Sequence, residues 1–280
     1  MNRQPMISFV GAGPGAADLI TLRGALRLSR ADIVIWASSL VPEALLMHCS
    51  KQARVHDSAV MTLEDVTEVY RSNPKAAIVR LHSGDPSIYG AIQEQIDWCL
   101  EHQRSFEIVP GVSSLGAAAA AIGRELTVPK IAQSVVLTRL ASRTSGSMPA
   151  LESLPAFAVH GATMAIFLSA SRPRQLAKAL LAPDSAYTPE TPAVIVVRAS
   201  WPDQQVIATT IGSLAEDLLA TGVKTTVLVL VGEAVGSLPA PRSHLYSPNF
   251  AHGYRKRSQA GSTAGRPAAG ATAGTRARRP

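Results

Sequence analysis

Short apolar runs alternate with amphipathic segments along the first half of the chain. The runs are continuous and rich in β-branched residues, and each is followed by apolar residues at helical spacing. Strands of a parallel sheet have this pattern, because helices cover both faces of such a sheet. The expected strands are Met6–Val10, Asp32–Trp36, Arg54–His56, Ala76–His82 and Phe106–Val109, and the expected helices are Thr21–Arg30, Pro42–His48, Leu63–Ser72, Tyr89–Glu101 and Ser113–Gly123.

The alternation breaks around Arg124–Lys130, where we expect a domain boundary. Two later strand patterns, Ala193–Val197 and Gln205–Thr209, are too close for a crossover and predict a hairpin, so the second sheet should be mixed. The sequence thus predicts an α/β fold with a parallel-sheet domain (1–124), a mixed-sheet domain (125–235) and a tail (236–280). The other expected strands are Ser134–Thr138, Met164–Leu168 and Thr226–Val231, and the other expected helices are Met148–Ala158, Pro173–Leu181 and Ile211–Thr221.

Composition and charge separate the tail from the rest. Hydrophobic residues make up 46% and charged residues 17% of the 280, as in a protein that buries a core. Of the 27 basic residues, eight lie in 236–280, which has no acid, and 19 remain against 20 acidic residues in the rest. A near-neutral folded part argues against nucleic acid as a partner. The tail is rich in Ala, Gly, Ser, Thr and Pro, which favours a disordered solvated extension over a binding arm.

The sequence gives little support for a disulfide-rich, metal-binding, secreted or membrane protein. The two cysteines, Cys49 and Cys99, form no CxxC pattern, so we expect neither a disulfide framework nor a metal site. The residues after Met1 are polar and unlike a secretory signal. Apolar stretches are far shorter than the roughly 20 residues that span a bilayer. We therefore expect a cytoplasmic protein without a membrane partner.

The first expected strand leads into Gly11-Ala12-Gly13-Pro14-Gly15. Glycine allows a sharp turn and a close approach of backbone to ligand. The spacing also fits a dinucleotide fingerprint, which requires an acidic residue about 20 positions on. The second strand ends instead in Trp36-Ala37-Ser38-Ser39, and Pro14 removes an amide that a pyrophosphate would bind. Nicotinamide binding is therefore disfavoured, while a structural turn and another binding loop both stay open.

Two more loops follow strands at the same expected sheet edge, where ligands of parallel α/β sheets collect. The first, His82-Ser83-Gly84-Asp85-Pro86-Ser87-Ile88-Tyr89, offers exposed backbone and a carboxylate. Asp85 before Pro86 also suits a helix N-cap, and the two roles are compatible. The second, Val109-Pro110-Gly111-Val112-Ser113-Ser114, has serines that either cap the next helix or bind a ligand.

Together these loops resemble the tetrapyrrole methylase family over roughly Ile7 to Val235. The resemblance rests on Gly-x-Gly-Pro-Gly, Leu19-Ile20-Thr21-Leu22-Arg23-Gly24, Gly84-Asp85-Pro86 and Pro110-Gly111-Val112-Ser113-Ser114. Further segments resemble the branch that methylates carbon 11 of a corrin precursor: Trp36-Ala37-Ser38-Ser39-Leu40-Val41-Pro42, Glu125-Leu126-Thr127-Val128-Pro129, Gln133-Ser134-Val135-Val136-Leu137-Thr138-Arg139 and the stretch from His160 to Ser169.

The resemblance implies a two-domain fold with a cofactor cleft between the domains, a homodimer, and an S-adenosyl-L-methionine-dependent C-methyltransferase of cobalamin biosynthesis. The cofactor leaves as S-adenosyl-L-homocysteine, and the substrate is a small-molecule corrinoid. Methylation of another corrin or porphyrin carbon, a cobalt-containing substrate, and a tetrapyrrole-binding module without activity are the alternatives. Carried over position by position, the cofactor contacts are Pro14, Ser83, Gly84, Asp85, Ile88, Ser113, Ser114, Leu168 and Ala199.

Some positions depart from the family pattern. Ala16, Leu168 and Ala199 replace residues common in relatives but leave backbone contacts possible. Ser38 replaces a usual glycine and Lys130 a usual acid, both toward the expected substrate side, which bears on the identity of the ring carbon.

For the substrate's carboxylates the candidates are Arg139 and Arg143, with Arg80, Arg172 and Arg198 as further ones; a surface salt bridge is the alternative for each. The loop Arg139–Met148 has the composition of a lid or of an ordinary connector. We assign no catalytic residue, because a sulfonium group leaves readily and positioning is the protein's main contribution. His82 and His160 are interpreted as packed side chains and not as bases.

Overall fold

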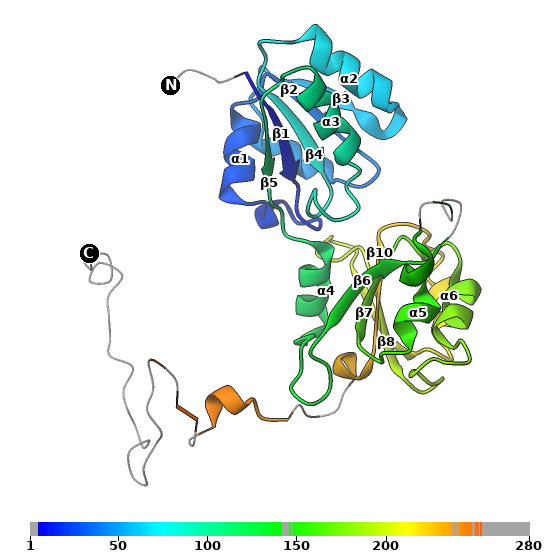
Figure 1. The fold of residues 1–280 in the computed structure, drawn as a ribbon. Coiled ribbons are helices and arrows are strands. Elements are labelled where there is room, and N and C mark those ends of the chain that lie inside the picture. The colour runs from blue at the N-terminus through cyan, green and yellow to red at the C-terminus, as the bar shows by residue number, and fades with distance from the viewer. Residues whose placement is uncertain are drawn as a thin grey trace. The chain divides into compact units, whose positions relative to one another are not determined.

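The computed structural model describes residues 5–141, 146, 148–236, 239, 241–247, 250, 251 and 253 (Figure 1). Contacts divide the chain into two compact units, 1–237 and 238–280. Both β-sheets lie in the first unit, and both have the predicted kind of strand pairing.

The first sheet is entirely parallel, with strand order β3-β2-β4-β1-β5. Because β4, β1 and β5 are neighbours, the three loops singled out in the sequence leave the sheet side by side at its carboxyl edge. The strands are β1 (Ile7–Gly11), β2 (Ile33–Trp36), β3 (Arg54–Asp57), β4 (Ile78–His82) and β5 (Phe106–Val109). The connections contain α1 (Leu22–Ser29), α2 (Leu63–Ser72), α3 (Gln93–Glu101) and the 3-10 helices η1 (Ala17–Leu19), η2 (Glu43–His48) and η3 (Ser58–Val60).

Helices cover both faces of the first sheet, as its continuous apolar strands predict. Phe9 and Ile35 point toward α2 and α3, where they pack with Tyr70. Alternate residues such as Val10 point to the other face and pack with Leu28 of α1. Figure 1 shows α1 and α2 on opposite sides of this sheet.

The second sheet is mixed, with strand order β6-β7-β10-β8-β9; β6 and β7 are parallel and the other pairs antiparallel. The predicted hairpin is present as β8 and β9. The strands are β6 (Val135–Arg139), β7 (Thr163–Phe167), β8 (Pro192–Val197), β9 (Gln205–Thr210) and β10 (Val227–Val231). The helices are α4 (Ser114–Ile122), α5 (Leu154–Ala158), α6 (Pro173–Leu180) and α7 (Leu214–Ala220), with 3-10 turns η5 (Ala150–Glu152) and η6 (Glu233–Val235).

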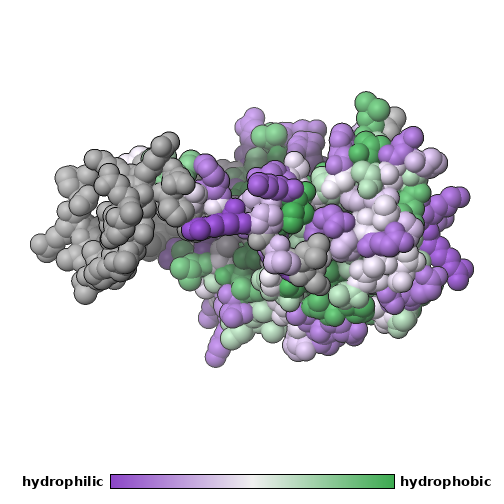
Figure 2. Space-filling model, turned by 90° about the horizontal axis from the view of Figure 1, so that it is seen from below, coloured by the Kyte–Doolittle hydropathy of each residue, from purple (hydrophilic) through white to green (hydrophobic). Residues whose placement is uncertain are grey.

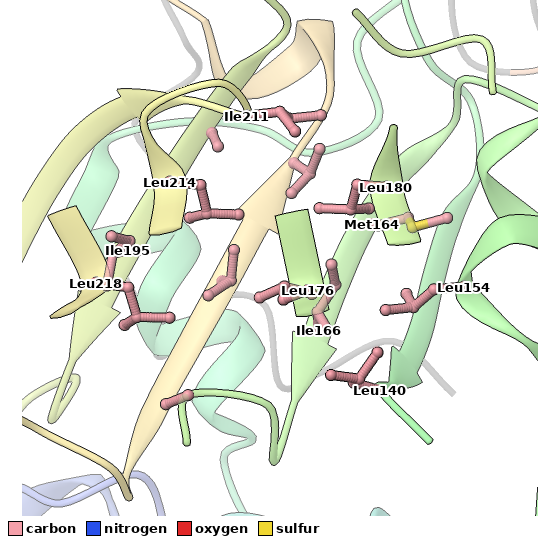
Figure 3. Packing of buried hydrophobic residues seen from close by; sticks show 14 of the residues in the cluster. Leu140, Leu154, Met164, Ile166, Leu176, Leu180, Ile195, Ile211, Leu214 and Leu218 are labelled. Carbon is pink, nitrogen blue, oxygen red and sulfur yellow. The ribbon is translucent and has the colours of Figure 1, made fainter. Parts of the chain in front are cut away.

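The core of the second sheet has two layers. On one face Ile166 and Ile195 pack with Leu176 and Leu218 from the covering helices (Figure 3). On the other face the alanines of α4 pack against β8 and β10, since small side chains allow a close approach of helix to sheet. Helix α4 therefore belongs with the second sheet, although it precedes the predicted boundary at 124/125. That boundary stays a prediction, since the contacts place both sheets in one unit.

Three predicted helices begin later than expected. Tyr89 and Ala91 have left-handed φ angles of 54° and 49°, so α3 begins only at Gln93 instead of Tyr89. The segment predicted as the helix Met148–Ala158 divides into η5 and the short α5, which Ser153 caps. Helix α7 begins three residues after Ile211. The other predicted elements agree with the observed bounds within two residues.

The surface of the described residues mixes polar and apolar side chains (Figure 2). The most exposed large apolar side chains are Leu22, Val60 and Leu151. In the part of the chain that the structure describes, no helix is both long and apolar enough to cross a membrane.

The second unit contributes a single described element, the 3-10 helix η7 (His244–Tyr246). Near it the ring of Phe250 meets that of His244 edge-on at 4.8 Å. Most of the tail lies outside the described residues, so its predicted disorder stays a prediction.

Candidate functional site

Glycines bring the three loops into direct backbone contact. Gly13 and Gly84 form a two-residue antiparallel bridge, with N···O distances of 3.3 and 2.8 Å. A Cβ atom on Gly111 would lie under 3.0 Å from the carbonyl oxygen of Gly84 and from the Cα of Gly11. The sequence left open whether glycines in these loops serve a structural turn or the approach of a ligand. At Gly11 and Gly111 the structure gives another reason, since the loops approach one another.

Asp85 links two of the loops. Its Oδ1 accepts a hydrogen bond from the Ser87 amide at 2.8 Å, and its Oδ2 accepts one from the Gly111 amide at 2.9 Å. Because α3 begins at Gln93, Asp85 does not cap that helix. The carboxylate instead holds the loop after β4 against the loop after β5.

Ser113 connects the first sheet to the second. Its Oγ accepts from the Leu115 amide at 3.3 Å, and so it caps α4, the helix that packs on the second sheet. The capping role that the sequence left open is therefore present.

A cavity of about 340 Å³ lies between these loops and the second sheet. Its wall contains all nine residues that the family resemblance selected as cofactor contacts: Pro14, Ser83, Gly84, Asp85, Ile88, Ser113, Ser114, Leu168 and Ala199. Residues from five separate segments of the chain thus meet around one space. That they contact a cofactor stays a prediction.

The sequence analysis missed part of the wall, above all Lys224–Leu228 at the start of β10. Since β10 runs antiparallel to β8, with Val227 opposite Val197, its beginning lies beside the end of β8. The predicted hairpin pairs β8 with β9 and does not indicate that β10 lies on the other side of β8, so no local pattern marks this part of the wall. The other wall residues that were not among the predicted contacts are Leu40, Phe167, Ser169, Ala170, Val196 and Tyr89, the last of which belongs to a predicted binding loop.

The turn after β7 presents Leu168 to the cavity. Leu168 has a left-handed φ of 53°, and 66% of its surface is exposed. Ser169 fixes the turn, since its Oγ accepts from the Leu140 amide at 2.8 Å and donates to the Phe167 carbonyl at 2.6 Å. Phe167 in turn lies 5.3 Å from the ring of Tyr89, which comes from the first sheet.

Charged side chains are few in the wall. Among the described residues that line the cavity, Asp85 is the single carboxylate and Lys224 the single cation. Burial raises the pKa of Tyr89, and the charge of Arg139 opposes this rise. Arg139 lies opposite the wall residue Phe167 in the pairing of β6 with β7 and does not itself line the cavity. The other predicted substrate ligand, Arg143, lies outside the described residues.

The two histidines differ in their surroundings. His82 is 7% exposed, and burial, with the positive charge of Arg80, lowers its pKa to about 3. The imidazole is therefore neutral at physiological pH and packs beside Phe9, as the sequence analysis interpreted it. His160, interpreted in the same way, is instead exposed, at the turn after α5. Neither residue lines the cavity.

These features define an α/β protein with a cavity between two sheets. The cavity falls in the usual range of ligand sites, roughly 300–1,000 Å³, and combines apolar walls with a few polar groups. A sequence model of the family described as Tetrapyrrole (Corrin/Porphyrin) Methylases matches residues 6–215. The chain belongs to this family.

Similar proteins within the family act on corrin precursors. The chain is 43% identical to a cobalt-precorrin-4 C(11)-methyltransferase of Methanocaldococcus jannaschii, over 91% of this chain and 98% of that one. It is 39% identical to a precorrin-4 C(11)-methyltransferase of a Sinorhizobium species, over 90% and 99% of the two chains.

Solved structures show the same fold. A cobalt precorrin-4 methyltransferase matches with a TM-score of 0.78 and 37% identity, over 82% of this chain and 96% of that one. A uroporphyrin-III C-methyl transferase of Thermus thermophilus, solved in complex with S-adenyl homocysteine, matches with a TM-score of 0.66 and 27% identity, over 82% and 93%.

Proposed function

We propose that the protein transfers a methyl group from S-adenosyl-L-methionine to carbon 11 of precorrin-4, giving precorrin-5, in the biosynthesis of cobalamin. One observation carries this proposal: all nine predicted cofactor residues line a single cavity. Relatives about 40% identical over most of the chain, which are named for this reaction, support it.

The residues of the cavity suit the proposed cofactor, which supplies an electrophilic methyl group. The hydroxyl groups of Ser83 and Ser114 offer hydrogen-bonding groups, and the side chains of Leu168 and Val196 offer apolar surface for the nucleoside. Asp85 and Lys224 provide one charge of each sign for the amino-acid part. These assignments are proposals for this chain.

We assign no side chain of the described wall the role of a base. Asp85 already accepts two backbone amides, and burial raises the pKa of the Tyr89 hydroxyl above its ordinary value. The protein's contribution is therefore positioning of the reactants, which can lower a barrier by roughly 7–11 kcal/mol. Arg139, which pairs with the wall residue Phe167 across β6 and β7, is the proposed partner for a substrate carboxylate.

The metal content of the substrate distinguishes two versions of the proposal. The chain is similar to relatives named for the cobalt-containing substrate and to others named for the metal-free one. Among the described residues, no group of three or more His, Cys, Asp or Glu is arranged to hold a metal ion. Because the relatives are named for either substrate, activity assays should include both precorrin-4 and cobalt-precorrin-4.

We also propose that the protein is a homodimer, as the family resemblance implies. Size-exclusion chromatography with light scattering tests this. A mass of twice 29.4 kDa is expected, and a monomer at assay concentration would contradict it.

Calorimetry with purified protein tests the cofactor. We expect S-adenosyl-L-methionine and S-adenosyl-L-homocysteine to bind with micromolar affinity, and NADH, the cofactor class that the glycine turn disfavours, not to bind. A tetrapyrrole-binding module without activity would bind neither S-adenosyl compound, and that result would end the enzyme proposal.

A further inference from the structure

The loop between β8 and β9, residues 198–204, is held in one shape by its own hydrogen bonds. Arg198 and Ser200 have left-handed φ angles of 49° and 67°, which side chains other than glycine rarely adopt. The amide of Ser200 donates to Oε1 of Gln204 at 2.7 Å, and the amide of Trp201 donates to the carbonyl of Arg198 at 2.9 Å. We call residues 198–204 the clamp loop.

The clamp loop is also fixed to the wall of the cavity. The amide of Arg198 donates to the carbonyl of Thr226, a wall residue, at 2.8 Å. The guanidinium of Arg198 pairs with Asp203 and lies 5.8 Å from the centre of the Trp201 ring. These contacts hold the Arg198 guanidinium near the indole and tie its backbone to the cavity wall.

Two hydrogen bonds then join the clamp loop to the glycine turn of the first sheet. Indole Nε1 of Trp201 donates to the carbonyl of Pro14 at 3.0 Å, and the amide of Ala16 donates to Oγ of Ser200 at 3.0 Å. The residue between them, Gly15, has no room for a side chain, because its Cβ would lie under 3.0 Å from Cδ1 and Nε1 of Trp201. The indole occupies the space that a side chain at position 15 would need.

The two bonded segments each carry a wall residue. Pro14, whose carbonyl accepts from Trp201, lines the cavity from the first sheet, and Ala199, next to Ser200, lines it from the second. Trp201 itself is not in the wall. We propose that Trp201 is a positioning residue that, together with Ser200, fixes the distance between these two walls of the cofactor cavity. This inference rests on the proposed function, because it takes the cavity as the cofactor site.

The proposal predicts that cofactor affinity depends on the fit between the indole and residue 15. Trp201→Phe keeps an aromatic ring and removes the donor to Pro14. It should weaken S-adenosyl-L-homocysteine binding roughly threefold to tenfold, the effect of one lost neutral hydrogen bond. Gly15→Ala should weaken binding at least tenfold, since the new methyl group pushes the glycine turn away from the indole.

A double-substitution cycle separates positioning from general destabilisation. In a Trp201→Ala background the methyl group that Gly15→Ala adds has room, so this second substitution should then change the dissociation constant less than twofold. Trp98→Phe is the matched control, because Trp98 lies on α3 away from the cavity wall and should leave affinity unchanged. Calorimetry gives the dissociation constants, and melting temperatures confirm that each variant is folded.

The outcomes distinguish this inference from the proposed function. A wild-type protein that does not bind S-adenosyl-L-homocysteine contradicts the proposed function itself. The proposed role of Trp201 alone is contradicted in two cases if the wild type binds. In the first, Trp201→Phe binds S-adenosyl-L-homocysteine as tightly as the wild type. In the second, Gly15→Ala raises the dissociation constant equally in the wild-type and Trp201→Ala backgrounds. If Trp201→Ala does not fold, the Trp201→Phe dissociation constant decides. A lower melting temperature with unchanged affinity means a merely structural role and overturns the proposal.

Discussion

At the scale of single residues, the glycines of the binding loops show what a sequence motif can and cannot say. At Gly15 and Gly111 the structure leaves no room for a side chain, whereas a Cβ atom at Gly84 would lie 3.7 Å from its nearest neighbour, an ordinary contact. The motif does not say what excludes a side chain, and at Gly15 and Gly111 the cause is protein, an indole in one case and two backbones in the other. Trp201 lies 187 residues along the chain from the Pro14 carbonyl that it contacts, a distance over which no local pattern is informative.

Gly111→Ala should therefore damage folding and not only binding. Its Cβ would meet the backbone of Gly84 and Gly11 in a region that has no flexible side chain to move. Overpacking of this kind costs about 1–3 kcal/mol or more. Gly116→Ala is the control, since Gly116 lies inside α4 with nothing within 4 Å of its Cβ position. Urea unfolding should show a large loss of free energy of unfolding for Gly111→Ala and no loss for Gly116→Ala. Equal stability of the two variants would contradict this explanation.

His82 should make stability depend on pH. Its pKa falls from 6.5 to about 3 in the folded protein, so between these values the unfolded chain binds a proton that the folded protein does not. Stability is thus fully present above pH 6.5 and decreases as the pH falls below it, by about 1.4 kcal/mol per pH unit at most. In the wild-type protein, the loss of free energy of unfolding caused by His82 is about 2 kcal/mol at pH 5.

His82→Gln removes this titrating group, so the comparison isolates its effect. Urea unfolding of both proteins at pH 7 and pH 5 should show a smaller loss on acidification for the variant. Equal losses would mean that His82 is not buried in its neutral form.

At the scale of elements, the alternation of apolar runs and amphipathic segments predicts the order and pairing of strands well. It fails where the backbone takes unusual angles, as at Tyr89 and Ala91, which delay the start of α3. Glutamate, glutamine and apolar residues after Tyr89 suit a helix, and no sequence rule signals a left-handed residue other than glycine or asparagine there. The loop after β4 is consequently longer than predicted and reaches the cavity with Ile88 and Tyr89.

The shape of that loop depends on Asp85. Asp85→Asn keeps one acceptor oxygen and places an NH₂ group against a backbone amide, so one of its two hydrogen bonds is lost. A hydrogen bond to a charged group contributes about 1.5–3 kcal/mol. Its loss should shift the loop out of its binding shape and lower cofactor affinity at least tenfold.

Asp97→Asn, on the exposed face of α3, is the matched control and should bind as wild type does. Calorimetry with S-adenosyl-L-homocysteine measures both variants. Wild-type affinity in Asp85→Asn would show that the carboxylate neither binds the cofactor nor shapes its loop.

At the scale of the whole molecule, the excess of basic over acidic residues comes from one segment, 236–280, which has no acid. Eight of the 27 basic residues lie in 236–280, and the contacts assign residues 238–280 to a unit of their own. Among the described residues of that unit, none lines the cavity.

Truncation after Ser237 should accordingly leave turnover and melting temperature unchanged. Attraction of an anionic substrate by the tail would act mainly at low ionic strength, because salt at about 0.15 M screens charges beyond about 8 Å. Thermal unfolding and steady-state assays at two salt concentrations test this. A loss of several degrees in melting temperature would show that the tail packs on the rest of the protein.

Transfer of an isotopically labelled methyl group tests the central claim most directly. The protein is incubated with precorrin-4 or cobalt-precorrin-4 and S-adenosyl-L-methionine that carries a ¹³C methyl group, and the product is examined by NMR. The account predicts one labelled methyl group, on carbon 11, with at least one of the two substrates. Label on any other carbon, or none with either substrate while S-adenosyl-L-homocysteine binds, would contradict it.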